Sequence, residues 1–222
     1  KVLELFAGSR SIGKAAEALG HEVFSSDIND FPGIDYLCDI LMFDSKQMPF
    51  QPDMIWASPP CTGFSVAAIG HHWTGGRGAY IPKTETAKLG IELLRETLRI
   101  IDEINPKVWF IENPRGLMRK MPELEGKHRK TVTYCQYGDS RMKPTDIWTN
   151  SRTWNPRPMC KNGAPCHEAA PRGSRTGTQG LKSNYERSKI PNDLCIEIIK
   201  SASLTNEKRK KSPPPCEELP SH

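Results

Sequence analysis

The sequence predicts an α/β fold with a mostly parallel sheet that carries helices on both faces. Three observations lead to this prediction. Short apolar runs alternate with segments of helical spacing, Gly, Pro and Asn punctuate the junctions, and the run at 108–111 is apolar throughout. A strand of a parallel sheet reads as a continuous apolar run because crossover helices bury both of its faces.

The first elements are a strand, a turn and a helix. Residues 1–6 are largely apolar, and residues 7–10 are small or polar. The next segment places apolar residues on one helix face: Ile12, Ala15, Ala16 and Leu19. Gly20 ends this helix, and a second strand runs to Asp27.

The middle of the chain continues the alternation. Residues 54–56 predict a buried strand, and residues 84–104 predict a long amphipathic helix that Asn105 and Pro106 end before strand 108–111. Between them, residues 66–83 are rich in Gly, His and basic residues without a sustained period, which predicts a mobile loop.

The last part of the chain divides into segments of different composition. Residues 131–137 and 146–150 predict two further strands, and residues 190–202 return to helical spacing. The division we predict is a main domain, a loop-rich insert, a C-terminal helical segment and a disordered tail, at residues 1–150, 151–186, 187–202 and 203–222.

Composition excludes several classes of protein. The 222 residues contain 31 Lys and Arg against 26 Asp and Glu, a net charge of +5 that is compatible with a nucleic-acid partner but common elsewhere. The apolar runs have strand length rather than membrane-spanning length. Seven scattered cysteines do not resemble a secreted disulfide framework. We therefore expect a soluble, cytoplasmic protein without a membrane partner.

The turn after the first strand is a candidate cofactor site. A turn of small residues between a strand and a helix lets a ligand approach the backbone and the free N–H groups of the helix. Asp27, at the end of the second strand, could accept both hydroxyls of a ribose. Together, the turn and Asp27 predict a nucleoside-containing cofactor. The alternative is an ordinary tight turn and a surface Asp. The glycine pattern differs from the dinucleotide fingerprint.

Two further residues follow or end predicted strands. Cys61 comes after the strand at 54–56, and Pro59 and Pro60 stiffen its approach, as suits an attacking sulfur. Glu112 ends the strand at 108–111, where partial burial would favour a protonated carboxyl that donates a proton or hydrogen bond. The alternatives are a buried inert thiol for Cys61 and a helix-terminal acid or salt-bridge partner for Glu112.

The order of these sites and their sequence motifs resemble those of the cytosine-5 DNA methyltransferases. The short insert and the Pro after Glu112-Asn113 resemble the phage-encoded members of that family. The match rests on five segments: 3–8, Asp27, 38–40, 59–65 and 112–113. The resemblance implies a Rossmann-like methyltransferase fold with S-adenosylmethionine as cofactor and S-adenosylhomocysteine as product. By resemblance, residues that hold the cofactor are Phe6, Ala7, Gly8, Ser9, Ser11, Ile12, Asp27, Ile28, Asp39, Ile40 and Pro59.

The same resemblance implies methylation of cytosine C5 in double-stranded DNA, with base flipping and a covalent adduct at Cys61 assisted by Glu112. A basic residue would steady the base, and the loose match at 137–145 leaves Arg141 and Lys143 as candidates. Segment 188–191 resembles the motif that packs back beside the cofactor. A monomer in bacterial or phage-infected cytoplasm is expected, and protection and regulation of a genome both stay open as roles.

The insert carries residues of less certain role. Cys160, Cys166 and His167 could ligate zinc with a fourth ligand such as Cys135, but their spacing is not standard, and we expect a loop with free cysteines and no metal. Candidates for phosphate contact are Arg152, Arg157, Arg172, Arg175 and Lys182. Candidates for a loop that closes over DNA are His71, His72, Trp73 and Arg77.

Two other functions stay open. An RNA cytosine methyltransferase would use the same active-site motifs, because a related branch of the family acts on transfer RNA. A protein that binds DNA or cofactor without catalysis would be consistent with the short insert and the loose basic motif. The joint presence of Cys61, Glu112 and the cofactor residues favours the active DNA enzyme.

Overall fold

The computed structural model describes residues 1–76, 79–169, 181 and 183–211. The strands are β1 (Val2–Leu5), β2 (Val23–Asp27), β3 (Tyr36–Leu37), β4 (Met54–Ala57), β5 (Trp73–Gly76), β6 (Ala79–Pro82), β7 (Val108–Pro114), β8 (Arg129–Thr133) and β9 (Pro144–Thr149). The helices are α1 (Ser11–Ala18), α2 (Ile69–His72), α3 (Glu85–Ile104), α4 (Asn184–Ser188) and α5 (Asn192–Lys211).

A seven-stranded sheet forms the centre of the molecule, in the order β3-β2-β1-β4-β7-β9-β8. The first five strands are parallel, and β9 runs antiparallel to both β7 and β8. The register places Leu3 opposite both Phe24 and Ile55. This arrangement confirms the predicted α/β fold with a mostly parallel sheet.

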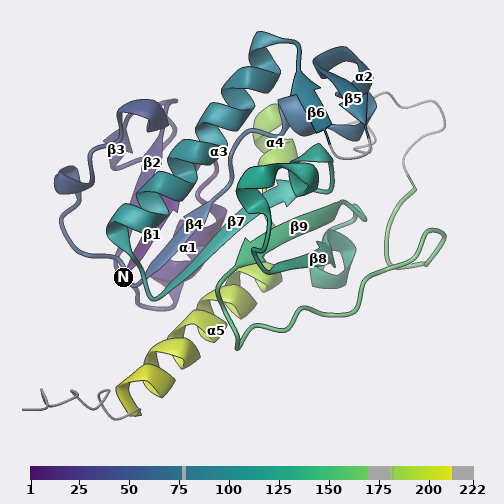
Figure 1. The fold of residues 1–222 in the computed structure, drawn as a ribbon. Helices are drawn as coiled ribbons and strands as arrows, with labels where there is room; N and C mark the ends of the chain where they lie inside the picture. The colour runs from purple at the N-terminus through teal and green to yellow at the C-terminus, as the bar shows by residue number, and fades with distance from the viewer. Residues whose placement is uncertain (77–78, 170–180, 182, 212–222) are drawn as a thin grey trace, which may run out of the picture.

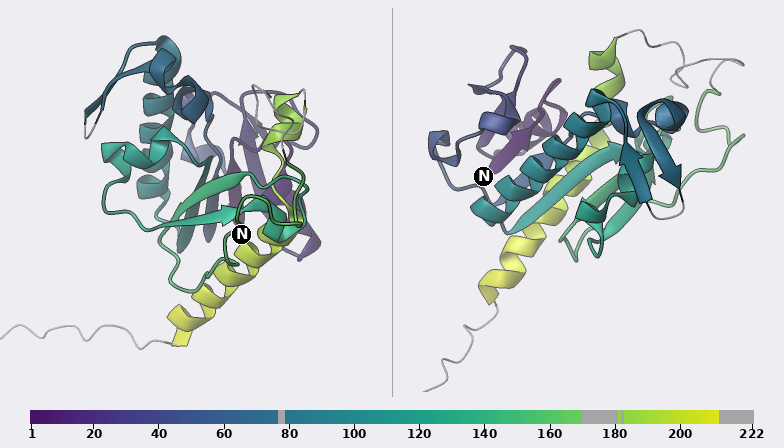
Figure 2. Two further views of the ribbon diagram at one scale, coloured as in Figure 1. Left: turned by 90° about the vertical axis from the view of Figure 1, so that its right-hand side faces the viewer. Right: turned by 45° about the horizontal axis from the view of Figure 1, so that its top comes forward.

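Helices cover both faces of the sheet, as predicted (Figures 1 and 2). On one face α3 packs against strand residues such as Leu5 and Ile111. On the other face α1 and α5 lie against each other and cover Val2, Trp56 and Phe110. Neighbouring residues of a strand point to opposite faces, so the two cores share the strands without sharing side chains.

Helix α3 has the limits that its sequence indicates. The Thr84 hydroxyl accepts a hydrogen bond from the Ala87 N–H at 3.3 Å and caps the first turn. Asn105 takes a left-handed conformation with φ 49° and ends the helix before Pro106. No helix among the described residues is long and apolar enough to cross a bilayer.

The mobile loop predicted at 66–83 is wrong for its described residues. They form α2 and the antiparallel hairpin β5–β6. Trp73 is buried, and its indole N–H donates to the Gly63 carbonyl at 2.6 Å. Trp73 and the partly buried Tyr80 attach this hairpin to the core, and its glycines hide the alternation by which strands are recognised.

Three boundaries also differ from the prediction. The strand expected at 131–137 stops at Thr133, and residues Tyr134–Tyr137 form one 3₁₀ turn, hereafter the 134–137 turn, which ends at Gly138 with φ 87°. Helix α4 crosses the boundary predicted between the insert and the C-terminal segment. Helix α5 continues to Lys211 instead of ending at Ala202, so the disordered tail predicted from residue 203 is wrong up to 211. The Glu, Lys and Arg residues there are good helix formers, and residues 212–222 lie outside the description.

Candidate active site

The predicted site residues meet at one edge of the sheet. Strands β1, β2, β4 and β7 are parallel neighbours, so their carboxyl ends lie together. The turn at 6–10 follows β1, Asp27 ends β2, Cys61 follows β4, and Glu112 lies near the end of β7. In open α/β sheets this edge is where ligands bind.

The turn after β1 has an unusual backbone. Phe6, Gly8 and Arg10 all have positive φ, at 54°, 50° and 53°, a conformation that costs free energy for the two residues other than glycine. A hydrogen bond from the Ala7 N–H to the Ser26 carbonyl at 3.0 Å ties the turn to β2. The turn therefore has a fixed shape that exposes backbone to a ligand.

Glu4 anchors this turn from below, a role that sequence reasoning missed. Its carboxyl oxygens accept hydrogen bonds from the Ile12 and Gly13 N–H groups at 3.1 and 2.9 Å. Burial raises the pKa of Glu4 to about 7, although both N–H groups oppose this rise. A side chain at Gly13 would collide with the carboxyl, because a Cβ there would lie 2.7 Å from its oxygen. The sequence feature that could have revealed this role is the presence of the acidic Glu4 inside an otherwise apolar strand.

Asp27 is oriented by the same turn. One carboxylate oxygen accepts from the Gly8 N–H at 2.9 Å, and the other accepts from the Asn29 N–H at 2.8 Å. Beside it, Ile28 is 63% exposed. Asp39 is exposed and caps the next short turn by accepting from the Leu41 N–H. Asp27, Ile28 and Asp39 thus offer a carboxylate, an apolar surface and a second acid.

The other predicted cofactor residues lie deeper. Ile12 is buried in the core beneath α1, and Ile40 is buried in the core beneath α3. Pro59 is buried, and its carbonyl accepts from the side-chain amide of Asn113. The Ile12 and Ile40 side chains therefore shape the site from behind rather than facing a ligand.

The C-terminal segment closes over the first turn. The Ile190 N–H donates to the Ser11 hydroxyl at 3.2 Å, and the Ser11 hydroxyl also pairs with that of Ser9 at 2.8 Å. A Cβ placed on Gly8 would lie 3.9 Å from the Ser188 hydroxyl oxygen. Segment 188–190 thus lies beside the candidate cofactor turn.

Cys61 is mounted on a rigid loop. It is exposed and precedes the short 3₁₀ turn Thr62–Phe64. The Asn113 amide donates to the Pro59 carbonyl at 2.8 Å, which joins this loop to β7. Phe64 is buried, and a Cβ on Gly90 of α3 would lie only 3.0 Å from its ring. The Cys61 sulfur is held in place while it stays open to a substrate.

The environment of Cys61 favours the thiol in the free protein. Crowding of its sulfur by the surrounding protein raises the pKa of Cys61, and the negative charge of Glu112 adds to the rise. The positive charges of Lys143 and Arg187 act in the opposite direction. Glu112, Lys143 and Arg187 are therefore near enough to act on the Cys61 sulfur.

Glu112 is buried and receives a hydrogen bond from the Tyr134 hydroxyl at 3.0 Å. Burial raises the pKa of Glu112, whereas Lys143 and the Tyr134 and Ser58 hydroxyls lower it. Burial also raises the pKa of Tyr134 well above its usual value, so this side chain stays a phenol that donates. Tyr134 was not predicted, because β8 was expected to continue through it.

The structure separates the two basic candidates. Arg141 is buried, and its guanidinium binds the Asp139 carboxylate and the carbonyls of Arg187 and Lys189. Lys143 instead lies with its ammonium 4.7 Å from the centre of the Tyr134 ring, and its charge affects both Glu112 and Cys61. Burial lowers the pKa of Lys143. Both side chains bind the Arg187 carbonyl of the C-terminal segment, Lys143 at 2.8 Å, and Lys143 in addition acts on Glu112 and Cys61.

The candidates for DNA contact are only partly assembled. The Arg157 guanidinium pairs with Asp193 and Glu197 of α5 and stacks on Tyr137 at 4.6 Å, so it packs onto the protein. His72 is buried and bonds the Thr84 hydroxyl at 2.7 Å. The side chains of His71 and Arg152 are exposed. The remaining candidates lie outside the described residues: Arg77, Arg172, Arg175 and Lys182.

Comparison with known proteins places this arrangement in a family. Residues 1–132 match the family of C-5 cytosine-specific DNA methylases. The chain is 30% identical over 214 residues to the "Probable DNA (cytosine-5)-methyltransferase" of Frog virus 3, covering 90% of this chain and 98% of the relative. The chain belongs to the C-5 cytosine-specific DNA methylase family.

Two further similar proteins are one from a chlorella virus and one encoded within a prophage. The chain is 30% identical over 151 residues to "Type II methyltransferase M.CviJI" of Paramecium bursaria Chlorella virus IL3A, covering 60% of this chain and 37% of that protein. A solved structure from E. coli described as a "putative DNA modification methyltransferase encoded within prophage" is 17% identical, with a TM-score of 0.49 over 92% of this chain and 68% of that chain.

Proposed function

We propose that this protein transfers a methyl group from S-adenosylmethionine to C5 of cytosine in double-stranded DNA, through a covalent bond between Cys61 and the base. The observation that carries the proposal is the convergence of Cys61, Glu112 and Lys143 at one edge of the sheet, where Glu112 and Lys143 both act on the Cys61 thiol and also act on each other. A cluster of perturbed ionisable groups at a ligand-binding edge is typical of an active site.

The residues at the turn after β1 fit the cofactor. Around Gly8, a Cβ would have no neighbour nearer than 3.9 Å, so a ligand has room at the backbone. The Asp27 carboxylate has about four lone-pair sites and accepts hydrogen bonds from the Gly8 N–H and from the backbone and side-chain N–H groups of Asn29, which leaves room for a ribose hydroxyl. The exposed Ile28 offers an apolar surface for a base. When bound, S-adenosylmethionine supplies an electrophilic methyl group.

Cys61 is the nucleophile in this proposal. Cytosine C5 is a poor nucleophile, and attack of the Cys61 thiolate on C6 turns C5 into an enamine-like carbon that can accept a methyl group. Loss of the C5 proton and elimination of the Cys61 sulfur then release 5-methylcytosine. The raised pKa of the Cys61 thiol means that the nearby positive charge of Lys143 is needed to favour the thiolate.

Glu112 stabilises the charge that this attack pushes into the ring. Its raised pKa favours the protonated carboxyl, which can donate to cytosine N3, while an oxygen accepts from the exocyclic amine. The Tyr134 hydroxyl orients the carboxyl at 3.0 Å. A cytosine stacked in a duplex cannot reach these groups, so the base is flipped out at a cost of a few kcal/mol.

The test is transfer of a labelled methyl group to duplex DNA of mixed sequence, with structured RNA in a parallel reaction. Label in 5-methylcytosine of the DNA is expected for the wild type and not for Cys61→Ala. The control is Leu19→Ala, which removes an exposed side chain at the C-terminal end of α1. Label mainly in RNA would show that RNA rather than DNA is the substrate. Full activity of Cys61→Ala would show that Cys61 is not the nucleophile.

A further inference from the structure

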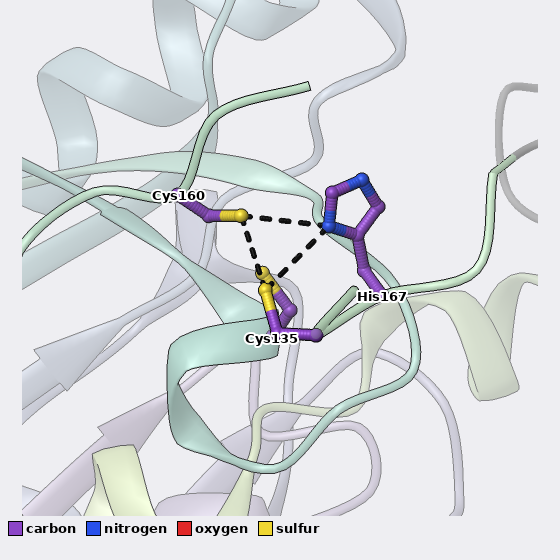
Figure 3. Close-up of side chains that lie close together, drawn as sticks. Cys135, Cys160 and His167 are labelled. Carbon is purple, nitrogen blue, oxygen red and sulfur yellow. Dashed lines mark hydrogen bonds between the residues drawn. The ribbon is translucent and has the colours of Figure 1, made fainter. Parts of the chain in front are cut away.

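Three cysteines and a histidine lie together outside the active site (Figure 3). They are Cys135 of the 134–137 turn and Cys160, Cys166 and His167 of the insert. One ligand atom of each lies within 4.8 Å of all the others. Residues distant in sequence thus present three sulfurs and one imidazole nitrogen to one point.

The distances match those between the ligands of one zinc ion. The Cys160 sulfur lies 3.2 Å from the Cys166 sulfur and 3.4 Å from His167 Nδ1, and the Cys166 sulfur lies 3.7 Å from the same nitrogen. Bonds of ~2.3 Å to sulfur and ~2.1 Å to nitrogen in a tetrahedron place two sulfurs about 3.8 Å apart and sulfur and nitrogen about 3.6 Å apart. A small outward movement of the thiols would accommodate the ion.

The structure also shows how Cys166 and His167, although adjacent in the sequence, can both reach one metal ion. Adjacent Cys166 and His167 would be hard to place around one ion if both side chains reached equally far. His167 instead directs Nδ1, the ring nitrogen nearer its backbone, toward the sulfurs (Figure 3). Cys135 supplies the fourth ligand that the insert lacks.

Hydrogen bonds around the cluster hold its ligands in place. The Cys160 N–H donates to the Thr133 hydroxyl at 2.8 Å, at the end of β8. The Gln136 amide donates to the Cys166 sulfur at 3.4 Å, which favours a thiolate there. The Glu168 N–H donates to the Ser140 carbonyl at 2.8 Å and fixes the chain beyond His167.

Residues 155–169 of the insert need such a link because they have almost no core. Among residues 155–169, which are all described, only Cys160 is buried. A segment without buried apolar side chains gains little from the hydrophobic effect, and a structural metal is a common substitute. A tetrahedral site closed by four protein ligands is typical of structural rather than catalytic zinc.

We propose that Cys135, Cys160, Cys166 and His167 bind a structural Zn²⁺ ion that fastens the insert to the 134–137 turn. Binding would release the thiol protons of the three cysteines, because the thiolates are the ligands. The link ends beside Tyr134, the residue that orients Glu112. The zinc would therefore hold the insert in a fixed position relative to the active site.

The direct test is the metal content of the full chain, purified with reductant and without chelator from cells supplied with zinc. We expect about one zinc ion per chain by elemental mass spectrometry. After removal of zinc, titration with Co²⁺ should give the intense visible bands of a tetrahedral site and the ultraviolet thiolate-to-cobalt band, saturating at one ion per chain.

Variants identify the ligands. Cys160→Ser and His167→Asn should each lose at least about tenfold in metal affinity, whereas Cys38→Ser, the same type of change at a half-exposed thiol outside the cluster, should keep full zinc content. If Cys160→Ser fails to fold, the number of zinc ions per wild-type chain and the Co²⁺ spectrum of the wild type still test the proposal. Zinc well below one ion per chain without a tetrahedral cobalt spectrum, or a Cys160–Cys166 disulfide in the reduced preparation, would overturn the proposal.

Discussion

The central sheet and insert residues 155–169 are held by different forces. Strands such as β4 and β7 are buried on both faces, and residues such as Ile55 and Phe110 have no exposed surface. The insert segment buries only Cys160 and is attached by hydrogen bonds, ion pairs and a cluster of cysteines. Apolar packing positions the reactive groups of the sheet, whereas a few specific polar contacts position the insert.

The largest effect on stability should come from the sheet. Phe110→Ala removes a ring that packs against Trp56 and Trp154, with centroid distances of 6.0 and 5.9 Å. It should lower the free energy of unfolding by about 3–5 kcal/mol, because a cavity remains in the core. Met159→Ala, at a 43% exposed position of the insert, should change it by less than about 0.5 kcal/mol. Urea denaturation measures both, and equal losses would remove the distinction between the two regions.

The reactive groups on the sheet should respond next most strongly. Glu112→Gln keeps the shape of the side chain but removes the titrating proton, so the rate of methyl transfer should fall about 10²- to 10³-fold. Binding of the cofactor should stay within about twofold of the wild type. Glu103→Gln on the surface of α3 is the matched control and should keep the wild-type rate. An unchanged rate in Glu112→Gln would contradict the proposed role.

The stability of the sheet should also depend on pH through Glu4. Its pKa rises from an ordinary 4.5 to about 7 in the folded protein, so the folded state binds more protons than the unfolded state between these values. The free energy of unfolding therefore falls as pH rises through this window, by at most about 3.5 kcal/mol at about 1.4 kcal/mol per pKa unit.

The comparison of Glu4→Gln with the wild type checks this dependence. The variant lacks the titrating group, so its stability should change less between pH 4.5 and 7. Thermal unfolding in buffers of equal ionic strength measures the difference. An equal change in stability in the wild type and in the variant across this window would show that Glu4 is not the group responsible.

The smallest effect should come from the ion pairs of the insert. Arg157→Ala loses pairs with Asp193 and Glu197, but its side chain is exposed, so the free energy of unfolding should fall by no more than about 1 kcal/mol. Protease cleavage within 155–169 should become faster, because the segment is less firmly attached. Cleavage at an unchanged rate would show that other contacts hold the insert.

The contrast also explains which features the sequence could predict. Apolar periodicity indicated the alternating strands and α3, because burial on a sheet depends on local pattern. It did not indicate the β5–β6 hairpin, whose attachment involves the buried Trp73. It also missed the end of β8 before Tyr134 and the continuation of α5 to Lys211.

The candidate site divides in the same way. Cys61, Glu112 and Asp27 were found because each follows or ends a strand. The choice between Arg141 and Lys143, two positions apart, required the surrounding contacts. The sequence offered Cys135 as one possible fourth ligand beside Cys160, Cys166 and His167, but their unusual spacing argued against a site, and only the folded insert shows that the four residues meet.

The covalent role of Cys61 is tested most directly by duplex DNA that carries 5-fluorocytosine, incubated with the protein and S-adenosylmethionine. Fluorine at C5 cannot leave as a cation, so elimination of the enzyme is blocked after methyl transfer. The account predicts one protein–DNA adduct stable to denaturant, mapped by mass spectrometry to Cys61 and absent in Cys61→Ala. Methylation of ordinary cytosine without such an adduct, or an adduct at another residue, would contradict it.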